Sequence, residues 1–245
     1  MGRGYSREAY LSLVEHVRDV VPGVSISSDF ISGFCGETEA DHRDTLSLME
    51  QVRYDQAFMY AYSLREKTRA ARRLEDDIPP EIKQRRLQEV IDTFRRNVLQ
   101  KNTEEEIGED RLVLVEGRSR RWSEEAPELT GRTDGNKRVV FPDGGVIDGL
   151  GRYKAGSDQL AVSTVPLRPG DYAVVNVREA SGHTLRGAAI ARTNLNEHAA
   201  FQAGGCRGSV MAGEAGGARS SVGAVAGLPK SERAFVRKEI PRIVF

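Results

Sequence analysis

The stretch SGFCGETEADHRDT, residues 32–45, gathers residue types that could carry out chemistry, namely a cysteine, a histidine and several carboxylates. By residue type alone, Cys35 is a candidate nucleophile or metal ligand. The chain has only one other cysteine, Cys206, in an unlike setting, which excludes a disulfide framework and a zinc site built mainly from cysteines. No Ser/His/Asp motif and no phosphate-binding loop of the G-x-x-x-x-G-K-[ST] type occurs. We predict no metal site and no catalytic side chain, and we interpret the four histidines as surface or packing residues: His16, His42, His183 and His198.

The turn around Cys35 is more informative than its thiol. The preceding run, residues 24–31, alternates as a strand does, and Thr38 with Asp41 forms a capping-box variant that predicts a helix start. Ligands of α/β sheets bind beyond the carboxyl ends of the strands, where this turn would lie. Glycines there allow close backbone approach, and the first N–H groups of a helix can bind an anion or polar ligand. The alternative is an ordinary strand-to-helix turn, which the pattern alone favours.

The surrounding segments alternate between helix and strand up to residue 101. Helical spacing, capping residues and apolar runs predict helices at 6–21, 38–53 and 80–101 and strands at 24–31 and 57–63. The charged segment 64–77 is predicted to be a loop with some helix. This order is typical of a parallel sheet or barrel. Two strands with their helices do not cover both faces of such a sheet, so we expect a truncated architecture that begins part-way through a larger unit.

The composition changes near residue 102. Short β-type runs follow at 111–117, 129–133, 137–141, 171–177 and 184–191, and Asp134-Gly135-Asn136 marks a hairpin. They predict a small all-β unit with a Gly-rich loop at 142–168. Beyond about residue 194 the chain is rich in Gly, Ala and Ser and is predicted to be disordered. The predicted fold class is therefore α/β plus a small all-β unit, with domains at 1–101, 102–193 and 194–245.

The overall composition sets few further limits. An apolar fraction of 39% and a charged fraction of 29% are typical of a globular protein. The formal net charge of zero gives no general attraction for a polyanion, so any such site must come from local clusters. No apolar run approaches the roughly 20 residues that span a bilayer. The N-terminal MGRGYSREAY has the pattern of neither a signal peptide nor a transit peptide, so we expect no presequence in this chain.

Several motifs resemble one enzyme family. The stretch SSDFISGFCGETEAD resembles S-x-D-I-I-x-G-F-P-G-E-T-E-x-D, and AYSLREKTRA resembles Y-S-P-R-x-G-T-x-A, in the barrel of radical SAM methylthiotransferases. The β-rich region 111–191 resembles the TRAM domain, which follows that barrel and binds RNA. The resemblance covers roughly residues 4–192 and is specific over 4–100. Cys35 stands where bacterial members carry proline, which indicates the animal mitochondrial branch and makes Cys35 a substitution in a turn.

The resemblance implies an activity, cofactors and partners. Family members add a methylthio group to N6-isopentenyladenosine beside the tRNA anticodon, using S-adenosylmethionine and two 4Fe-4S clusters. The cluster-binding cysteines are absent from this sequence, so we expect a C-terminal fragment that is inactive by itself. The implied partners are tRNA and a kinase regulatory subunit, with no membrane, and the implied location is the mitochondrion, with the cytoplasm as an alternative. The alternative function is a non-enzymatic RNA- or protein-binding product.

The resemblance also assigns candidate residues for S-adenosylmethionine. It places the backbone of Gly33, Phe34 and Gly36 near the adenine, and it directs Ser28, Asp29 and Arg65 into the mouth of the barrel. Glu37 would accept a hydrogen bond from the ligand or cap the turn. A surface ion pair is an equally good interpretation of Arg65, and Lys67 stands where the family usually has glycine.

Two groups are candidates for RNA binding. Arg132, Lys137 and Arg138 flank the predicted hairpin turn, and Phe141 is a candidate for stacking a base. The second group is both basic and aromatic, and comprises Arg118, Arg120, Arg121 and Trp122. A solvated charged face is the simpler interpretation of any single residue among them. Their grouping on a TRAM-like unit favours RNA.

Overall fold

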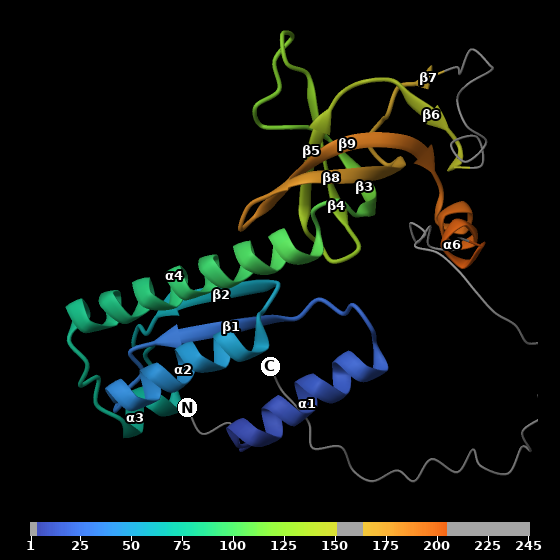
Figure 1. Ribbon diagram of the computed structural model, residues 1–245. Coiled ribbons are helices and arrows are strands. Elements are labelled where there is room, and N and C mark those ends of the chain that lie inside the picture. Colours follow the sequence, from blue (N-terminus) through green and yellow to red (C-terminus); the bar gives the residue numbers. More distant parts are fainter. Residues whose placement is uncertain (1–3, 151–163, 205–245) are drawn as a thin grey trace, which may run out of the picture. The chain divides into compact units, whose positions relative to one another are not determined.

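A computed structural model describes residues 4–150 and 164–204 of the chain (Figure 1). The first part of this region is an α/β unit with the helix and strand order that the sequence predicts. Its elements are α1 (Arg7–Val20), β1 (Ser27–Ser32), α2 (Glu39–Val52), β2 (Gln56–Ala61), α3 (Arg69–Arg73) and α4 (Pro80–Glu105). The charged segment 64–77, expected to be a loop with some helix, contains the short helix α3, and α4 continues to residue 105.

The α/β unit packs its helices on one face of a two-stranded sheet. β1 and β2 are parallel, with Phe30 opposite Met59 in the register. Residues of α1, α2 and α4 enclose this face in one apolar core, which contains Val14, Met49 and Phe94. These buried contacts stabilise the unit, because each removes apolar surface from water.

The opposite face of the sheet is uncovered within the described residues. Ile31 of β1 and Phe58 and Tyr60 of β2 are 38%, 51% and 54% exposed. Side chains alternate between the two faces of a strand, so these residues share the face that the helices do not cover. The expectation that two strands leave one face unfilled is met in this part of the chain.

The second part of the described region is a closed β-barrel. Its strands are β3 (Asp110–Arg118), β4 (Glu128–Thr133), β5 (Arg138–Pro142), β8 (Tyr172–Ala180) and β9 (Thr184–Thr193). Antiparallel pairs run in the order β5-β4-β3-β8-β9, and a parallel pairing of β5 with β9 closes the ring, with Val139 opposite Leu185. The barrel interior is an apolar core around Val113, Phe141 and Val175. The predicted all-β unit is confirmed.

Two regions differ from the sequence-based expectation. The segment 142–168, expected to be a loop, contains β6 (Val146–Asp148) and β7 (Thr164–Val165), and β6 pairs with β9. The tail expected to be disordered from residue 194 begins with a helix, α6 (Leu195–Gly204). The Asn194 side chain caps this helix by accepting from the Glu197 N–H at 2.9 Å. The rest of the expected tail, 205–245, lies outside the described residues.

Buried charges connect the α/β unit with the hairpin between β4 and β5. Lys137 of the hairpin lies 2.8 Å from Glu106, which follows α4, and 3.6 Å from Asp55, which precedes β2. Lys101 of α4 lies 2.9 Å from the same oxygen of Asp55. The side chain of Asp55 is only 3% exposed, and besides these two ammonium groups it accepts from the Ile26 N–H at 2.9 Å.

None of the described helices has both the length and the apolar character that crossing a membrane requires.

Candidate functional site

The turn between β1 and α2 is shaped by two glycines in the left-handed region. Gly33 and Gly36 have φ angles of +75° and +74°. A Cβ on Gly33 would lie 2.4 Å from the Cγ atom of Lys83 on α4, whereas a Cβ on Gly36 would meet nothing within 4 Å. Gly33 is therefore required by the close packing of α4 as well as by backbone conformation.

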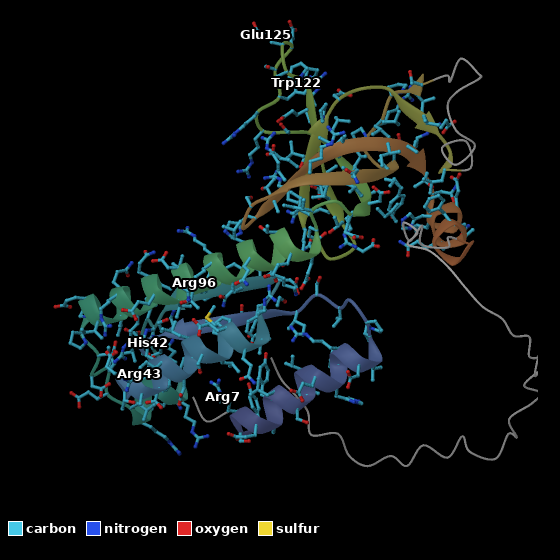
Figure 2. The ribbon with its side chains drawn as sticks, viewed as in Figure 1. Arg7, His42, Arg43, Arg96, Trp122 and Glu125 are labelled. Atoms are coloured by element: carbon cyan, nitrogen blue, oxygen red, sulfur yellow. The ribbon has the colours of Figure 1, made fainter. Side chains whose placement is uncertain are left out.

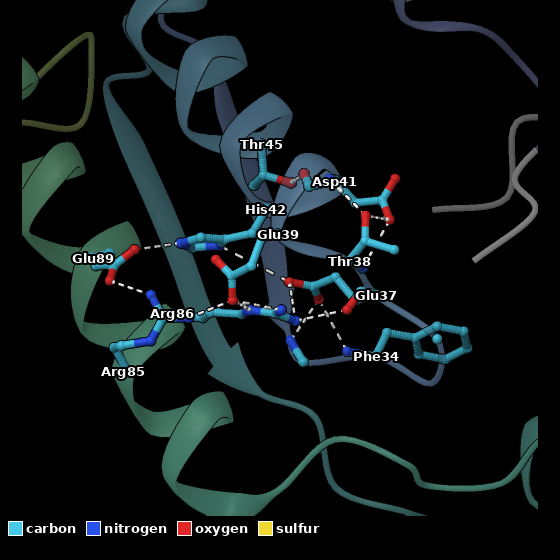
Figure 3. Close-up of polar contacts among 12 residues, drawn as sticks. Phe34, Glu37, Thr38, Glu39, Asp41, His42, Thr45, Arg85, Arg86 and Glu89 are labelled. Carbon is cyan, nitrogen blue, oxygen red and sulfur yellow. Dashed lines mark hydrogen bonds and ion pairs between the residues drawn. The ribbon is translucent and has the colours of Figure 1, made fainter.

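The backbone N–H groups of this turn already donate hydrogen bonds to carboxylates of the protein (Figure 3). The Oε2 atom of Glu37 accepts from the N–H groups of Gly33 at 2.6 Å and Phe34 at 3.1 Å. Asp77 accepts from the N–H group of Gly36 at 2.8 Å. Of the two roles expected for Glu37, the structure shows the capping role. These three amides are consequently not free donors for an anion or an adenine ring.

A buried arginine and a buried histidine hold Glu37 and the start of α2 (Figure 3). Arg86 of α4 is 4% exposed, and it donates to the main-chain oxygen of Glu37 at 2.9 Å and to Glu39 at 2.8 Å. His42 is 2% exposed, and its Nε2 atom lies 2.6 Å from Glu89 of α4. Sequence reasoning missed both roles, because no local spacing signals a contact between residues more than forty positions apart.

The charge network affects the protonation of its outer members. The hydrogen bond from His42 is the largest cause that lowers the pKa of Glu89; burial acts in the opposite direction, and the hydrogen bond from Arg85 lowers the pKa further. At the start of α2, the side chain and then the backbone N–H of Thr38 lower the pKa of Asp41. These two groups form the predicted capping box, with Asp41 accepting from the Thr38 N–H at 2.9 Å. The lowered pKa values keep both carboxylates ionised at neutral pH, so their hydrogen bonds at the start of α2 persist there.

The side chains of Ser28 and Asp29 do not both point into the mouth of the barrel, contrary to what the resemblance implies. Ser28 and Asp29 are consecutive residues of β1, so their side chains point to opposite faces of the sheet. Asp29 shares the uncovered face with Ile31, whereas Ser28 shares the helix-covered face with Phe30. The expectation that both point into one mouth is wrong for Ser28.

Arg65 is exposed in the loop after β2. Its main-chain oxygen accepts from the Thr68 hydroxyl at 2.8 Å, and Lys67 between them has a φ of +67°. That left-handed conformation explains why a glycine suits position 67 in the family pattern. In the two described ranges, the Arg65 side chain makes no hydrogen bond or ion pair.

The described residues supply no metal centre. Cys35 is a free, half-buried thiol. The neighbouring Tyr62 has a raised pKa, first because of burial and then because of its hydrogen bond with Cys35. Over residues 4–150 and 164–204, no three His, Cys, Asp or Glu side chains are gathered as metal ligands would be. The second cysteine, Cys206, lies outside the described residues. Within the described part of the chain, the donor set does not fit an iron–sulfur cluster, since each iron requires a thiolate or equivalent ligand.

Two of the predicted RNA-binding residues are buried and make contacts within the protein instead. Phe141 is 1% exposed within the barrel core, so it cannot stack on a base without unfolding the barrel. The side chain of Lys137 is 12% exposed and is held between Glu106 and Asp55. Both expectations are corrected, because alternation places Phe141 on the inner face of β5 and the hairpin directs Lys137 toward α4.

The other two hairpin residues border a small cavity. Arg132 donates to the Asn136 main-chain oxygen at 3.0 Å, and Arg138 donates to the Thr130 hydroxyl at 3.3 Å. With His183 they line a cavity of about 270 Å³. The guanidinium groups keep unused donors, so they remain candidates for phosphate contacts.

The second RNA-binding group lies on the loop between β3 and β4. Arg118 at the end of β3 is exposed, and its guanidinium carbon lies 3.9 Å from the centre of the Trp122 ring. Arg120 and Arg121 are exposed on the same loop. Figure 2 shows Trp122 and Glu125 on this loop, where it projects from the barrel. The structure thus stacks one guanidinium group on an aromatic ring and places two further exposed arginines on the same loop.

Comparison with known proteins finds relatives that include tRNA methylthiotransferases. The human mitochondrial tRNA methylthiotransferase CDK5RAP1 (Homo sapiens) is 49% identical over 201 residues, which is 82% of this chain and 31% of that protein. A CDK5RAP1-like protein of Oryza sativa subsp. japonica is 46% identical over 197 residues, which is 80% of this chain and 31% of that protein. The chain spans about a third of the length of these curated relatives.

A bacterial protein shows the same similarity at lower identity. The tRNA-2-methylthio-N(6)-dimethylallyladenosine synthase of Chloroherpeton thalassium is 40% identical over 190 residues, which is 78% of this chain and 37% of that protein. The matched region is the C-terminal part of the relatives. No protein-family model matches the chain.

Proposed function

We propose that this chain, which belongs to the tRNA methylthiotransferase family and matches the C-terminal part of its members, acts as the RNA-gripping and barrel-closing part of such an enzyme. The enzyme would add a methylthio group to N6-isopentenyladenosine beside the anticodon by radical SAM chemistry. Residues 1–101 would form the C-terminal part of the radical SAM barrel, residues 102–193 a TRAM-like domain, and residues 194–245 a tail.

The uncovered face of β1 and β2 is the observation that carries this proposal. A parallel sheet is normally covered on both faces, yet Phe58 and Tyr60 are more than half exposed here. The internally satisfied turn at Gly33 stands beside this face, at the carboxyl end of β1. An open face with a rigid turn at its rim is what the wall of a larger barrel with a ligand at its mouth requires.

The described residues fit S-adenosylmethionine in part. Asp29 on the open face and exposed Arg65 offer charged groups for its amine and carboxylate, and the turn offers main-chain oxygens and the Phe34 ring. The amides of Gly33, Phe34 and Gly36 are not available. When bound, S-adenosylmethionine supplies the methyl group and the radical of the family reaction. The chain's own residues would bind and orient it and exclude water.

The proposed substrate and location follow from the relatives. The tRNA would be held by the barrel, and the mitochondrion would be the location, as the names of the animal relatives state for those proteins. The kinase regulatory subunit that the resemblance adds as a partner, and the cytoplasm as a second location, are not part of this proposal.

A chimera tests the proposed function. Residues 4–204 of this chain would replace the matching segment of the human relative, and the methylthio content of tRNA would be measured by mass spectrometry after anaerobic reconstitution with iron and sulfide. We expect methylthiolated adenosine at a level comparable with the unmodified relative. A folded chimera that loads its clusters but leaves the tRNA unmodified would contradict the proposal.

A second function follows from the two-cysteine content of the chain. Without cysteines to hold two clusters, the 245-residue chain would bind RNA but would not catalyse the reaction. Iron analysis after anaerobic reconstitution separates the two roles. The chain alone is expected to retain no cluster iron, while the human relative treated in parallel retains it; retention of iron by the chain would overturn the binding-only role.

A further inference from the structure

We propose that the loop joining β3 to β4, residues 118–127, stacks an unpaired RNA base on a platform made by Arg118 and Trp122. This inference rests on the RNA-binding role proposed above and assigns that role to one surface of the barrel. The ligand class is single-stranded RNA, because the faces of bases in a duplex are already stacked on their neighbours.

The platform is formed by two flat groups in direct contact. The guanidinium of Arg118 lies over the indole of Trp122 at 3.9 Å, within the distance of a cation–π interaction. Arg118 is exposed and Trp122 is half-buried. A base that lies on the outer face of the guanidinium or on the open part of the indole would extend this stack. Stacking of this kind accepts any base, because every base has a π-face.

The loop is folded before a ligand arrives. Ser119 organises its first turn, since its side chain accepts from the Arg121 N–H at 3.1 Å and its main-chain oxygen accepts from the Trp122 N–H at 3.2 Å. The Ser119 N–H in turn donates to the Glu128 main-chain oxygen at 2.8 Å. Binding therefore costs little conformational entropy, because the indole is already held against Arg118.

One polar group of the platform is unsatisfied. In the part of the chain that the structure describes, the indole N–H of Trp122 is shielded from solvent and has no acceptor. Buried indole N–H groups usually have a partner. A bound nucleotide can supply this acceptor after a small rotation of the ring, which would complete the hydrogen bonding of the loop.

The charges of the loop define the path of the strand. Arg120 and Arg121 are exposed, and in the described ranges neither side chain forms an ion pair, although the charge of Arg121 contributes to the lowered pKa of Glu128. Both guanidinium groups can therefore contact phosphates. Glu124 and Glu125 lie further along the loop and are also exposed (Figure 2). Their carboxylates repel phosphates, so the backbone of the RNA would pass on the arginine side. Base amino groups could donate to the two carboxylates.

The hairpin between β4 and β5 is a weaker candidate for base stacking. The aromatic residue predicted for that role, Phe141, is buried in the barrel core, and Lys137 is held by two carboxylates. Arg132 and Arg138 can still contribute phosphate contacts. The 118–127 loop would therefore stack the base, and arginines of both surfaces would contact phosphates.

Trp122 is the only tryptophan in the chain, so intrinsic fluorescence reports directly on this site. The full chain would be titrated with a fluorescein-labelled single-stranded oligoadenylate and with a fully paired RNA duplex of the same length. Anisotropy of the label measures binding, and tryptophan emission measures stacking. We expect the single strand to bind and to quench Trp122, and the duplex to leave its emission nearly unchanged.

Substitutions then separate stacking from charge. Trp122→Ala is expected to weaken binding of the single strand roughly five- to 150-fold, the range reported for the loss of one stacked base. Arg118→Lys keeps the positive charge but replaces the planar guanidinium with an ammonium group that cannot stack. It should therefore weaken binding and reduce quenching. Arg178→Lys makes the same change at an exposed arginine of β8, so it is the matched control for Arg118→Lys and should have a smaller effect. Circular dichroism verifies that each variant is folded.

The two readouts distinguish the possible failures. If the single strand binds wild type and Trp122→Ala equally and leaves the emission unchanged, the RNA binds elsewhere on the protein, and the platform is wrong while the proposed function stands. If neither RNA changes the anisotropy, the chain does not bind RNA, and the RNA-binding role itself fails. Quenching together with the loss in Trp122→Ala supports the platform.

Discussion

Arg86 is the residue on which the geometry of the β1–α2 turn depends. It is 4% exposed and donates to Glu37 and Glu39. Its guanidinium forms an ion pair with the carboxylate of Glu37. That carboxylate in turn accepts hydrogen bonds from the N–H groups of Gly33 and Phe34. The side chain thus holds the proposed ligand site through Glu37, by its hydrogen bond to the main-chain oxygen and by its ion pair with the carboxylate.

Arg86→Met is expected to destabilise the chain by about 3–5 kcal/mol, because it leaves a partly buried carboxylate without its cation. The free energy of unfolding in urea measures this loss. The matched control is Arg85→Met on the same helix, since Arg85 makes exposed ion pairs with Glu39 and Glu89 and its loss should have a much smaller effect. Equal losses in the two variants would contradict the role assigned to Arg86.

Glu89 makes the stability of the same network depend on pH. Its pKa is lowered below the ordinary value of 4.5, first by the hydrogen bond from His42 and further by Arg85. A carboxyl whose pKa is lower in the folded state stabilises the fold above its unfolded pKa, and this contribution disappears as the pH falls through the folded pKa. Glu89→Gln should therefore lower the melting temperature at pH 7, and the difference from wild type should shrink below pH 4.5. A difference that stays constant across this range would show that the charge of Glu89 has no part in it.

At the scale of elements, the β1–α2 turn and α4 are built to fit each other. Gly33→Ala would place a methyl group within 2.4 Å of Lys83, whose ammonium pairs with Asp76, so the side chain cannot move freely. We expect a loss of about 2–4 kcal/mol, from left-handed strain of about 1–2 kcal/mol and the displacement of α4. Gly36→Ala has the same strain but open space around it, and should cost only the first part. Thermal unfolding of the two variants separates the contributions, and equal losses would contradict the packing argument.

Much of the element pattern could be predicted from local sequence. Ser6 and Thr38 cap α1 and α2 as predicted, because capping depends on residues within one turn. The five barrel strands were found from β-type runs between turn residues. Helix α6 was missed, although Asn194 followed by Glu197 is a helix-start pattern, because the Ala- and Gly-rich composition around it was interpreted as disorder.

The candidate site could be predicted only in part. The glycines and Glu37 of the turn are local and were identified, whereas the partners that fix them, Arg86 and His42, come from contacts distant in sequence. Phe141 and Ser28 were misplaced because the pattern of residue types does not state which face of a strand points inward. Tertiary packing decides which face of a strand points into the core.

At the scale of the whole molecule, Lys137 couples the α/β unit to the barrel through Asp55 and Glu106. Lys137→Met should make the two parts unfold less cooperatively, because each carboxylate loses one of its cations. Circular dichroism reports mainly on the helices of the α/β unit, and Trp122 emission reports on the barrel. We expect coincident transitions for wild type and separated transitions for Lys137→Met. Arg132→Met is the control and should keep them coincident, because half-buried Arg132 of the same hairpin pairs with Glu116 of the barrel and not with Asp55 or Glu106.

The uncovered sheet also affects how separate copies of this chain behave toward one another. In the described residues β1 and β2 pair only with each other, so each strand has one edge with unpaired backbone groups. Such edges, beside an apolar face that carries Phe58 and Tyr60, are templates for strand addition between molecules. Expressed by itself, the chain should therefore aggregate as its concentration rises, and a polypeptide that covers β1 and β2 should act on it as a chaperone does.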